Sequence, residues 1–514
     1  MRDTVYDVAI TGFGPAGAVA AALLGQAGVR VWVGDRLPDV YEIPRAIALD
    51  HEIMRVFQQI GVVDAIAAHF EPFTPSEYYG VDGQLIRRMT MVAPPYPQGY
   101  TPSLVFTQPP VERALRARVA ELPNVTVALS TEVRQLAQDA DGVTLDTVDA
   151  QGTPQRIRAK WALACDGGAS GLRAQLGIDL IDLDFDEPWL VVDVRCNERG
   201  LARLPQTSVQ YCEPDRPCTY VIGPGNHRRW EISLKEGEDP KEAATPERTW
   251  DLLSRWLTPE DGELWRQSSY RFHALVAARW RVGRAFLAGD SAHMQPPFLG
   301  QGMCQGVRDV ANLCWKLVSV VQGQVQGDAA ERLLDSYGAE RQAHVRELTT
   351  RIKAVGAVIC ERDVAKARER DARLLAECGG VVQDTPRQDV LPRLERGCLS
   401  TQDTPGRGKL FPQPWLQGPD GQRTRMDTAL GHGWRLVLAT DAPELPADAA
   451  RIRPPQRTTL HLASTPETEG VAQGWFAQHG CRAALLRPDH HVFGTASDTT
   501  QLQSLLHEAA TWWA

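Results

Sequence analysis

Several features that would mark a membrane, secreted or nucleic-acid-binding protein are missing from this sequence. It has no run of about 18 apolar residues, so we expect no membrane-spanning helix. Its first residues lack the pattern of a signal peptide. The net charge is -9 and no block of Lys or Arg occurs, which argues against nucleic-acid binding. The ten cysteines include no Cys-x-x-Cys pair, so neither a metal site nor a disulfide framework is expected. Free thiols in a reducing cytoplasm are the simplest interpretation.

The chain of 514 residues is too long for one hydrophobic core, and two to four domains are expected. An α/β fold is predicted, because an apolar strand, a glycine-rich turn, a small-residue helix and a second strand follow one another at the start. Residues 181–275 carry short alternating segments that predict an inserted antiparallel sheet. The expected divisions are 1–180 (with a loop-rich stretch at 71–108), 181–275, 276–395 with long helices, and 396–514 as a small α/β domain.

The first motif is the glycine pattern of Gly12, Gly14 and Gly17, placed between the first expected strand and helix. Such glycines permit a tight turn, a close approach of backbone to a pyrophosphate, and close packing of helix on strand. The helix N-terminus then offers free N–H groups to the phosphates. Asp35, at the end of the second expected strand, can accept hydrogen bonds from a ribose. The pattern favours a dinucleotide over a ligand-free turn, but it does not separate FAD from NAD.

Two further segments follow expected strands. Residues 165–173 (CDGGASGLR) come after a strand at 161–164, and residues 284–293 (RAFLAGDSAH) contain a strand that runs into a turn at Asp290. Residues 296–303 then open a long helix, whose N-terminus would stabilise an anionic reduced flavin. Either segment alone is also compatible with an ordinary turn, whereas all three in this order favour one cofactor site.

With these motifs the sequence resembles the class A flavoprotein aromatic hydroxylases, the family of p-hydroxybenzoate and phenol hydroxylases, and within it the 3-(3-hydroxyphenyl)propionate hydroxylases. The resemblance covers residues 5–355, and at 410–413 and 487–489 it extends to the thioredoxin-like tail of the larger members. It implies a Rossmann-like FAD-binding domain with an inserted antiparallel-sheet substrate domain and a thioredoxin-like C-terminal domain. Without a Cys-x-x-Cys pair the tail should not be redox-active. The stretches that carry the resemblance most clearly are 44–46, 108–112, 270–317 and 337–341.

The resemblance also implies which residues hold FAD. Two positions depart from the common pattern, since Asp35 stands where many members have Glu and Cys304 where many have Asn. The residues expected to bind FAD are Gly12, Gly14, Ala16, Gly17, Asp35, Arg36, Arg45, Gln108, Asp166, Gly167, Gly289, Asp290, Pro297, Gly300, Gln301, Gly302 and Met303.

The reaction implied by the resemblance is hydroxylation of a phenolic ring by a flavin C4a-hydroperoxide, formed from FAD, NADH or NADPH, and O2. A phenol reacts better as phenolate, so a proton acceptor or relay is needed. His273, Tyr211 and Tyr220 are candidates, although each is also readily explained as a packed sheet residue. The carbonyl of Pro297 is expected to face the flavin and orient the oxygen, because proline fixes φ and removes a donor.

The expected substrate is a small phenol with a short acidic side chain, converted to a catechol. Arg87, Arg88, Arg228 and Arg229 are candidates to bind the acid, with solvated surface arginine as the alternative explanation. A polycyclic polyketide hydroxylase, a flavin oxidoreductase that does not hydroxylate, and a non-enzymatic dinucleotide sensor remain alternatives. The sequence does not distinguish NADH from NADPH, and it leaves the oligomeric state open, with a homodimer as one candidate.

Overall fold

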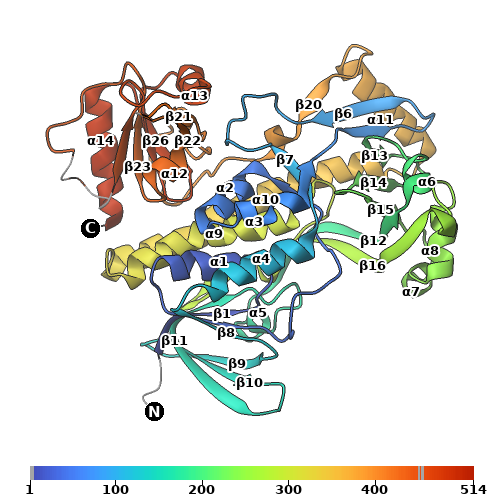
Figure 1. Ribbon diagram of the computed structural model, residues 1–514, viewed down its shortest axis with the longest axis horizontal. Helices are drawn as coiled ribbons and strands as arrows, with labels where there is room; N and C mark the ends of the chain where they lie inside the picture. Colours follow the sequence, from blue (N-terminus) through green and yellow to red (C-terminus); the bar gives the residue numbers. More distant parts are fainter. Residues whose placement is uncertain (1–4, 419, 450–451, 453–456, 514) are drawn as a thin grey trace.

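The computed structural model describes residues 5–418, 420–449, 452 and 457–513 (Figure 1). Its N-terminal sheet has the order β17–β18–β11–β1–β2–β8, and β10 and β9 extend it from β11. The strands from β8 to β18 along this order are mutually parallel, as the expected strand–helix–strand start predicts. The strands are β1 (Val5–Thr11), β2 (Val31–Gly34), β8 (Val125–Ala128), β9 (Glu132–Gln138), β10 (Val143–Val148), β11 (Pro154–Ala164), β17 (Arg281–Val282) and β18 (Ala285–Leu287).

Helices cover one face of this sheet, as Figure 1 shows. Helix α1 (Pro15–Gln26) packs against α4 (Gln108–Ala120) and α9 (Gly302–Val321), and its small side chains allow this close approach. It begins at Pro15, and proline is favoured in the first helical turn. The long helices expected in 276–395 are α9 and α10 (Gly327–Cys360), which are separated by a short break at 322–326. The other helices of this half are α2 (His51–Ile60), α3 (Val63–Ile66) and α5 (Gly171–Gln175).

A second, nine-stranded sheet forms the other wall of the molecule, in the order β19–β16–β12–β15–β14–β13–β5–β6–β20. Its centre is antiparallel, as expected for the inserted segment. Two parallel pairs extend it, because β13 pairs with β5 and β6 pairs with β20. These outer strands come from the loop-rich stretch and from beyond α10, and they satisfy backbone groups that an isolated insert would leave unpaired. The strands are β5 (Ser76–Tyr79), β6 (Leu85–Thr90), β12 (Leu180–Cys196), β13 (Ser208–Tyr211), β14 (Cys218–Ile222), β15 (His227–Ser233), β16 (Gly262–Ala277), β19 (His293–Met294) and β20 (Asp384–Pro386).

Smaller elements join the two sheets. The strands β3 (Ala48–Asp50), β7 (Ser103–Phe106) and β4 (Phe70–Pro72) form a three-stranded antiparallel sheet. None of the helices in the described part of the chain is long and apolar enough to cross a membrane. Four further helices lie around the large sheet. These helices are α6 (Glu198–Leu201), α7 (Pro240–Ala243), α8 (Pro246–Leu253) and α11 (Val364–Glu377).

The C-terminal part is a four-stranded sheet in the order β24–β23–β25–β26, with the thioredoxin-like mixture of parallel and antiparallel pairs that the resemblance implied. Alternate side chains of β23 enter two cores, one under α13 and one shared with α14 and the start of α10. The elements are β21 (Trp415–Gln417), β22 (Arg423–Arg425), α12 (Met426–Leu430), β23 (Arg435–Leu438), β24 (Thr458–His461), α13 (Val471–His479), β25 (Ala483–Leu486), β26 (Val492–Ala496) and α14 (Thr499–Ala510).

Candidate functional site

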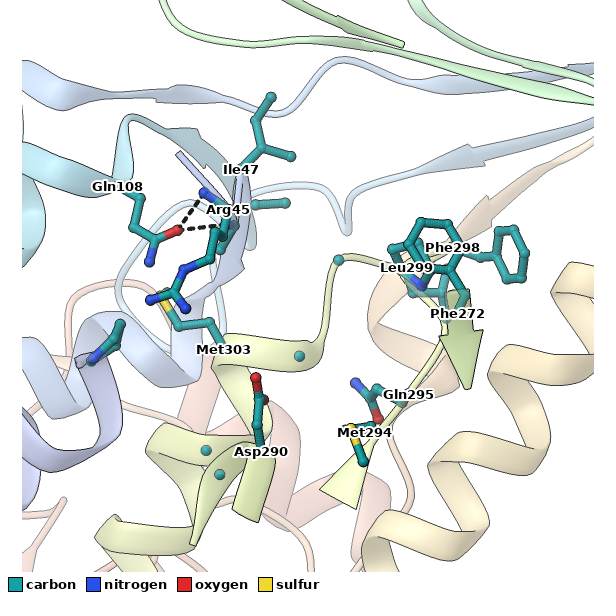
Figure 2. A pocket seen from close by; sticks show the side chains of 18 of the residues that line it. Arg45, Ile47, Gln108, Phe272, Asp290, Met294, Gln295, Phe298, Leu299 and Met303 are labelled. Atoms are coloured by element: carbon teal, nitrogen blue, oxygen red, sulfur yellow. Dashed lines mark hydrogen bonds between the residues drawn. The ribbon is translucent and has the colours of Figure 1, made fainter. Parts of the chain in front are cut away.

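A cavity of about 410 Å³ lies between the N-terminal sheet, the start of α9 and the nine-stranded sheet (Figure 2). Two kinds of side chain line it. Glycines and short side chains come from the three motifs of the first domain, and apolar or polar side chains come from the nine-stranded sheet. Of the residues expected to contact FAD, those that line this cavity are Gly14, Ala16, Arg45, Gln108, Gly167, Gly289, Asp290, Pro297, Gly300, Gly302 and Met303.

The first glycine motif divides into structural and ligand-facing positions. A Cβ at Gly12, where φ is +97°, would lie 2.2 Å from the Cys165 carbonyl oxygen, and a Cβ at Gly17 would lie 2.0 Å from that of Gly12. These two glycines therefore let strand, turn and helix pack together. Gly14 is different, because a Cβ there would meet nothing within 4 Å, and Gly14 lines the cavity at the N-terminus of α1. The free N–H groups of that helix end suit a pyrophosphate.

Asp35 and Arg36 lie outside the lining of this cavity. Asp35 accepts a hydrogen bond from the Phe13 N–H at 2.6 Å, so it braces the turn that precedes Gly14. A carboxylate has further lone pairs, so Asp35 is still able to accept from a ribose at the same edge. Arg36 is exposed, and no contact in the structure assigns it a role.

In the second motif, too, one residue stabilises the turn and another lines the cavity. Asp166 accepts hydrogen bonds from Ser170 Oγ at 2.5 Å and from the Leu172 N–H at 3.2 Å, so it stabilises the start of α5. Gly167 has φ +84° and lines the cavity, and a Cβ there would meet nothing within 4 Å. The open side of this turn can therefore receive a cofactor, whereas Asp166 mainly fixes its shape.

The third motif is held by one buried carboxylate, that of Asp309 on α9. It accepts from the Gly289 N–H at 2.9 Å and from Arg341 Nε at 2.9 Å, and it lies 2.7 Å from His293 Nε2. Burial opposes its ionisation, but the charges of His293 and Arg341 outweigh burial and lower the pKa of Asp309. His293 therefore contacts the Gly289 turn through Asp309. This leaves the exposed Asp290 carboxylate free to face a cofactor hydroxyl.

The start of α9 presents backbone to the cavity. Gly302 and Met303 line it, while the Gln301 side chain turns away, its Nε2 3.3 Å from Asp50 Oδ2 and its Oε1 accepting from Arg308 at 2.8 Å. Gln301 is therefore a support of the helix start rather than a contact through its side chain. The Pro297 carbonyl accepts the Gly300 N–H at 2.7 Å, which occupies one of its two lone pairs.

Residues 44–46 form the opposite lip of the cavity, where Gln108 Oε1 accepts the N–H groups of Arg45 at 2.8 Å and Ala46 at 2.6 Å (Figure 2). From the nine-stranded sheet, Arg229 donates to the Arg45 carbonyl at 2.8 Å. Asp193 holds this arginine at 2.7 Å. Arg229 was considered as a contact for a substrate acid, but in the structure it is paired with the Asp193 carboxylate and donates to the Arg45 carbonyl.

The three candidates for a proton relay are separated by the alternation of β-strands. Neighbouring residues of a strand point to opposite faces, and Gln210 and Thr219 line the cavity. Tyr211 and Tyr220 therefore lie on the far face, where the Tyr211 hydroxyl accepts from Trp256 at 3.0 Å. Burial raises the pKa of both phenols. The structure does not bring either tyrosine to the cavity, whereas His273 lines it, 3.5 Å from Asp186.

Three charged residues of the cavity wall were missed by sequence reasoning. They are Glu231 on β15, Arg271 on β16 and Arg387, which follows β20. Glu231 had a signal in the sequence, since it alternates with the apolar Trp230 and Ile232 of an expected strand. Arg387 had none, because nothing local shows that its segment joins the sheet. Of the other arginines considered, Arg87, Arg88 and Arg228 are not part of the cavity lining.

The arrangement fits FAD. Gly14 and Gly167 leave open space where a Cβ would otherwise project, two helix N-termini face the cavity, and the Asp290 carboxylate is free at its edge. Within the described residues no group of three or more His, Cys, Asp or Glu could hold a metal ion, and all ten cysteines are free.

Comparison with known proteins agrees with this geometry. A family model described as FAD binding domain matches residues 5–352, and one described as HcaD C-terminal domain matches residues 408–511. The probable NADH-specific resorcinol 4-hydroxylase of Rhodococcus jostii is 35% identical over 98% of this chain and 94% of its own length. This chain belongs to the FAD-dependent aromatic hydroxylases.

A further relative and two solved structures are also similar to this aromatic hydroxylase. The 3-(3-hydroxy-phenyl)propionate/3-hydroxycinnamic acid hydroxylase of Mycobacterium sp. (strain JLS) is 33% identical over 96% of the chain and 89% of its own length. Among solved structures, the flavin-dependent monooxygenase PieE in complex with FAD and substrate superposes with a TM-score of 0.82 over all of both chains. Aklavinone-11 hydroxylase with FAD and aklavinone gives 0.80 over 99% of this chain and 100% of its own. These two structures are 22% and 24% identical to the chain, so they establish the fold.

Proposed function

We propose that this hydroxylase acts on a small phenol with a short acidic side chain, of the 3-(3-hydroxyphenyl)propionate kind, and adds a hydroxyl group next to the existing one to give a catechol. The observation that carries the proposal is the size of the cavity. Its 410 Å³ lies toward the lower end of the range for ligand pockets, about 300 to 1,000 Å³. The same space is lined by the cofactor turns, so a flavin ring and a substrate must share it. A single ring fits this requirement better than a polycycle.

Different residues of the chain would bind the cofactor, exclude water and move the proton. FAD, when bound, supplies the oxygen-transfer chemistry, with NADH or NADPH and O2 as co-substrates. The three glycine-rich turns, Asp290 and the start of α9 would bind and orient it. Phe272, Phe298 and Leu299 form an apolar wall opposite Met303 (Figure 2) that would exclude water from the reacting atoms. The second lone pair of the Pro297 carbonyl and the His273 ring remain the groups proposed to orient oxygen and to move the phenolic proton.

The named relatives support the substrate class. Two of them are named for small phenols, resorcinol in one case and 3-(3-hydroxy-phenyl)propionate or 3-hydroxycinnamic acid in the other. The polyketide alternative rests on solved structures that resemble this chain in fold. We further propose that the enzyme acts in the cytoplasm, where its cysteines stay reduced, and that a homodimer is the assembly to test by light scattering.

The deciding experiment is a panel of phenols assayed for stimulation of NADH and NADPH oxidation, with mass spectrometry of the products. The proposal predicts that 3-(3-hydroxyphenyl)propionate accelerates oxidation and yields a 2,3-dihydroxy product that is heavier by one oxygen. Oxidation without oxygen in the product would support the non-hydroxylating alternative. Stimulation by a polycyclic phenol, with none by the small acid, would support the polyketide alternative.

A further inference from the structure

The wall that the nine-stranded sheet and its flanking segment contribute to the cavity holds two charged side chains with no partner of opposite charge among the described residues. The other charged groups contributed by this sheet are already paired. Arg229 lies 2.7 Å from Asp193, and Arg271 lies 2.8 Å from Asp186. Glu231 and Arg387 stand apart from this pattern. Buried polar groups are normally satisfied, so an exception inside a binding cavity points to a missing ligand.

Glu231 is a buried carboxylate that faces the cavity. It is 6% exposed, and among the described residues no hydrogen bond or ion pair reaches its oxygens. Its neighbour across the strands, Thr219, donates its hydroxyl proton to Gln210 Oε1 at 2.6 Å and is not available to Glu231. Burial raises the pKa of Glu231, although the nearby Arg229 acts in the other direction. The carboxylate therefore has acceptor capacity directed at whatever fills the cavity.

The Arg387 side chain lines the same cavity. Arg387 directly follows β20, and the pairing of β20 with β6 fixes its position. It donates to the Leu299 carbonyl at 3.1 Å and lies 3.5 Å from Ser76 Oγ, and its Cζ is 4.2 Å from the centre of the Phe73 ring. Within the described part of the chain no carboxylate lies at ion-pair distance. Burial lowers the pKa of Arg387, as expected for a charge without a counter-ion. These contacts hold the side chain in place and leave its charge uncompensated.

The two groups lie on opposite sides of the cavity floor. Ser76, beside Arg387, is on β5, and Glu231 is on β15, which lies three strands away through β13 and β14. Three strand spacings amount to about 14 Å between backbones. Both side chains line the same cavity, so a ligand with one aromatic ring and a short chain could lie between them. The arrangement suits a ligand with a hydroxyl at one end and an anion at the other.

We propose that Glu231 and Arg387 bind the two ends of the substrate: Glu231 accepts a hydrogen bond from the ring hydroxyl, and Arg387 binds the anionic group of the side chain. The inference rests on the proposed function and assigns its specificity to two residues. A carboxylate at the hydroxyl increases the electron density of the ring, and a fixed anion sets which ring carbon faces the flavin. Charge-assisted hydrogen bonds of this kind are about twice as strong as neutral ones.

The first test compares 3-(3-hydroxyphenyl)propionate with 3-ethylphenol, which lacks the acid, in the FAD-loaded enzyme. Arg387→Met should raise KM for the acid about 10- to 100-fold and change KM for the neutral phenol little, while Arg387→Lys should restore part of the difference. Arg255→Met, on an arginine that lies on the far face of the sheet, is the matched control and should alter neither. Equal effects of Arg387→Met on both ligands would overturn the assignment.

The second test concerns the hydroxyl end and uses binding, followed by the change in flavin absorbance. Glu231→Gln should weaken binding of 3-(3-hydroxyphenyl)propionate about 10- to 100-fold and leave that of 3-phenylpropionate, which has no hydroxyl, unchanged. Glu263→Gln, on an exposed strand position of β16, is the control. Equal loss for both ligands, or no loss, would remove Glu231 from the proposal.

These results separate this inference from the proposed function. A wild-type enzyme that hydroxylates neutral phenols but does not prefer the acid would contradict the assignment of Arg387, while the hydroxylase function would stand. A wild-type enzyme that no small phenol stimulates would overturn the proposed function itself.

Discussion

Two buried polar regions of this molecule differ in how their charges are satisfied. In the cavity, Glu231 and Arg387 have no partner of opposite charge among the described residues, and Gly14 and Gly167 leave open space. In the contact between helices α9 and α10 and the C-terminal domain, charges are buried together. Arg487 lies 2.7 Å from Glu340, and Lys316 lies 3.0 Å from the same carboxylate. The comparison shows that buried charge alone does not identify a binding site. What identifies it is hydrogen-bonding capacity that the protein leaves unused.

A second cluster at the same contact sharpens the distinction. Asp427 of the C-terminal domain lies 2.8 Å from Arg55 of α2 and 2.5 Å from Arg435, and all three side chains are fully buried. Arg55 also donates to the Phe411 carbonyl at 2.7 Å. A buried ion pair of this kind adds little over an apolar contact, but removing one partner leaves the others uncompensated. Each charge of this cluster is therefore stabilising only as long as the other two are present.

The largest effect is expected from breaking this cluster. Asp427→Ala leaves two buried arginines without a carboxylate and should lower the free energy of unfolding by about 3–5 kcal/mol. Urea unfolding followed by circular dichroism measures the change. Asp403→Ala, which removes a carboxylate that is 69% exposed and paired on the surface, is the control and should cost less than about 1 kcal/mol. Equal unfolding midpoints for the two variants would contradict the comparison.

The pH dependence of stability should report the same contact. Burial alone would raise the pKa of Glu340, but Arg487 and Lys316 lower it to about 2. Since the folded-state pKa lies below the ordinary value, the stabilisation is present above about pH 4.5 and is lost as the pH falls toward 2. It amounts to about 3 kcal/mol. The difference in unfolding free energy between wild type and Glu340→Gln should therefore shrink between pH 6 and pH 3, and a constant difference would refute the assignment.

In the cavity the expected effect falls on the cofactor rather than on the protein. Asp290→Ala removes a free acceptor and should weaken FAD binding by about 1.5–3 kcal/mol, together with activity. The stability of the FAD-free protein should not change, because nothing in the fold depends on this carboxylate. Titration of FAD into the apoprotein measures the loss. Asp82→Ala, at an exposed loop position, serves as the control, and unchanged FAD affinity in Asp290→Ala would exclude the contact.

The smallest effect is expected on the far face of the sheet. Tyr211→Phe removes the hydrogen bond from Trp256 and should cost about 0.5–1.5 kcal/mol of stability. It should leave kcat unchanged, because the hydroxyl points away from the cavity. A large loss of kcat with normal FAD content would show that this tyrosine reaches the reaction after all.

The sequence predicted the parts of the structure that rest on local patterns. The glycine spacing around Gly12 predicted the first strand, turn and helix, and the alternation near Trp230 predicted the central strands of the second sheet. Three features depend on contacts between distant segments, and sequence reasoning did not find them. These are the addition of β5, β6 and β20 to that sheet, the role of Asp309 behind the Gly289 turn, and the charges that hold the C-terminal domain. The same limit explains the site, where the family pattern named the cofactor turns but gave no place to Glu231 or Arg387.

The strands of the nine-stranded sheet come from segments far apart in the sequence, and this determines when the cavity can form during synthesis. The pairing of Asp384 with Arg88 joins segments made early and late in synthesis. Strand pairing over such a sequence distance is slow, because the chain loses the entropy of closing the loop before the paired strands stabilise it. On the ribosome, the N-terminal sheet can assemble while the edge of the second sheet still waits for β20. The wall that carries Arg387 is then the last part of the cavity to be completed, and the nascent chain exposes an open strand edge until that segment emerges.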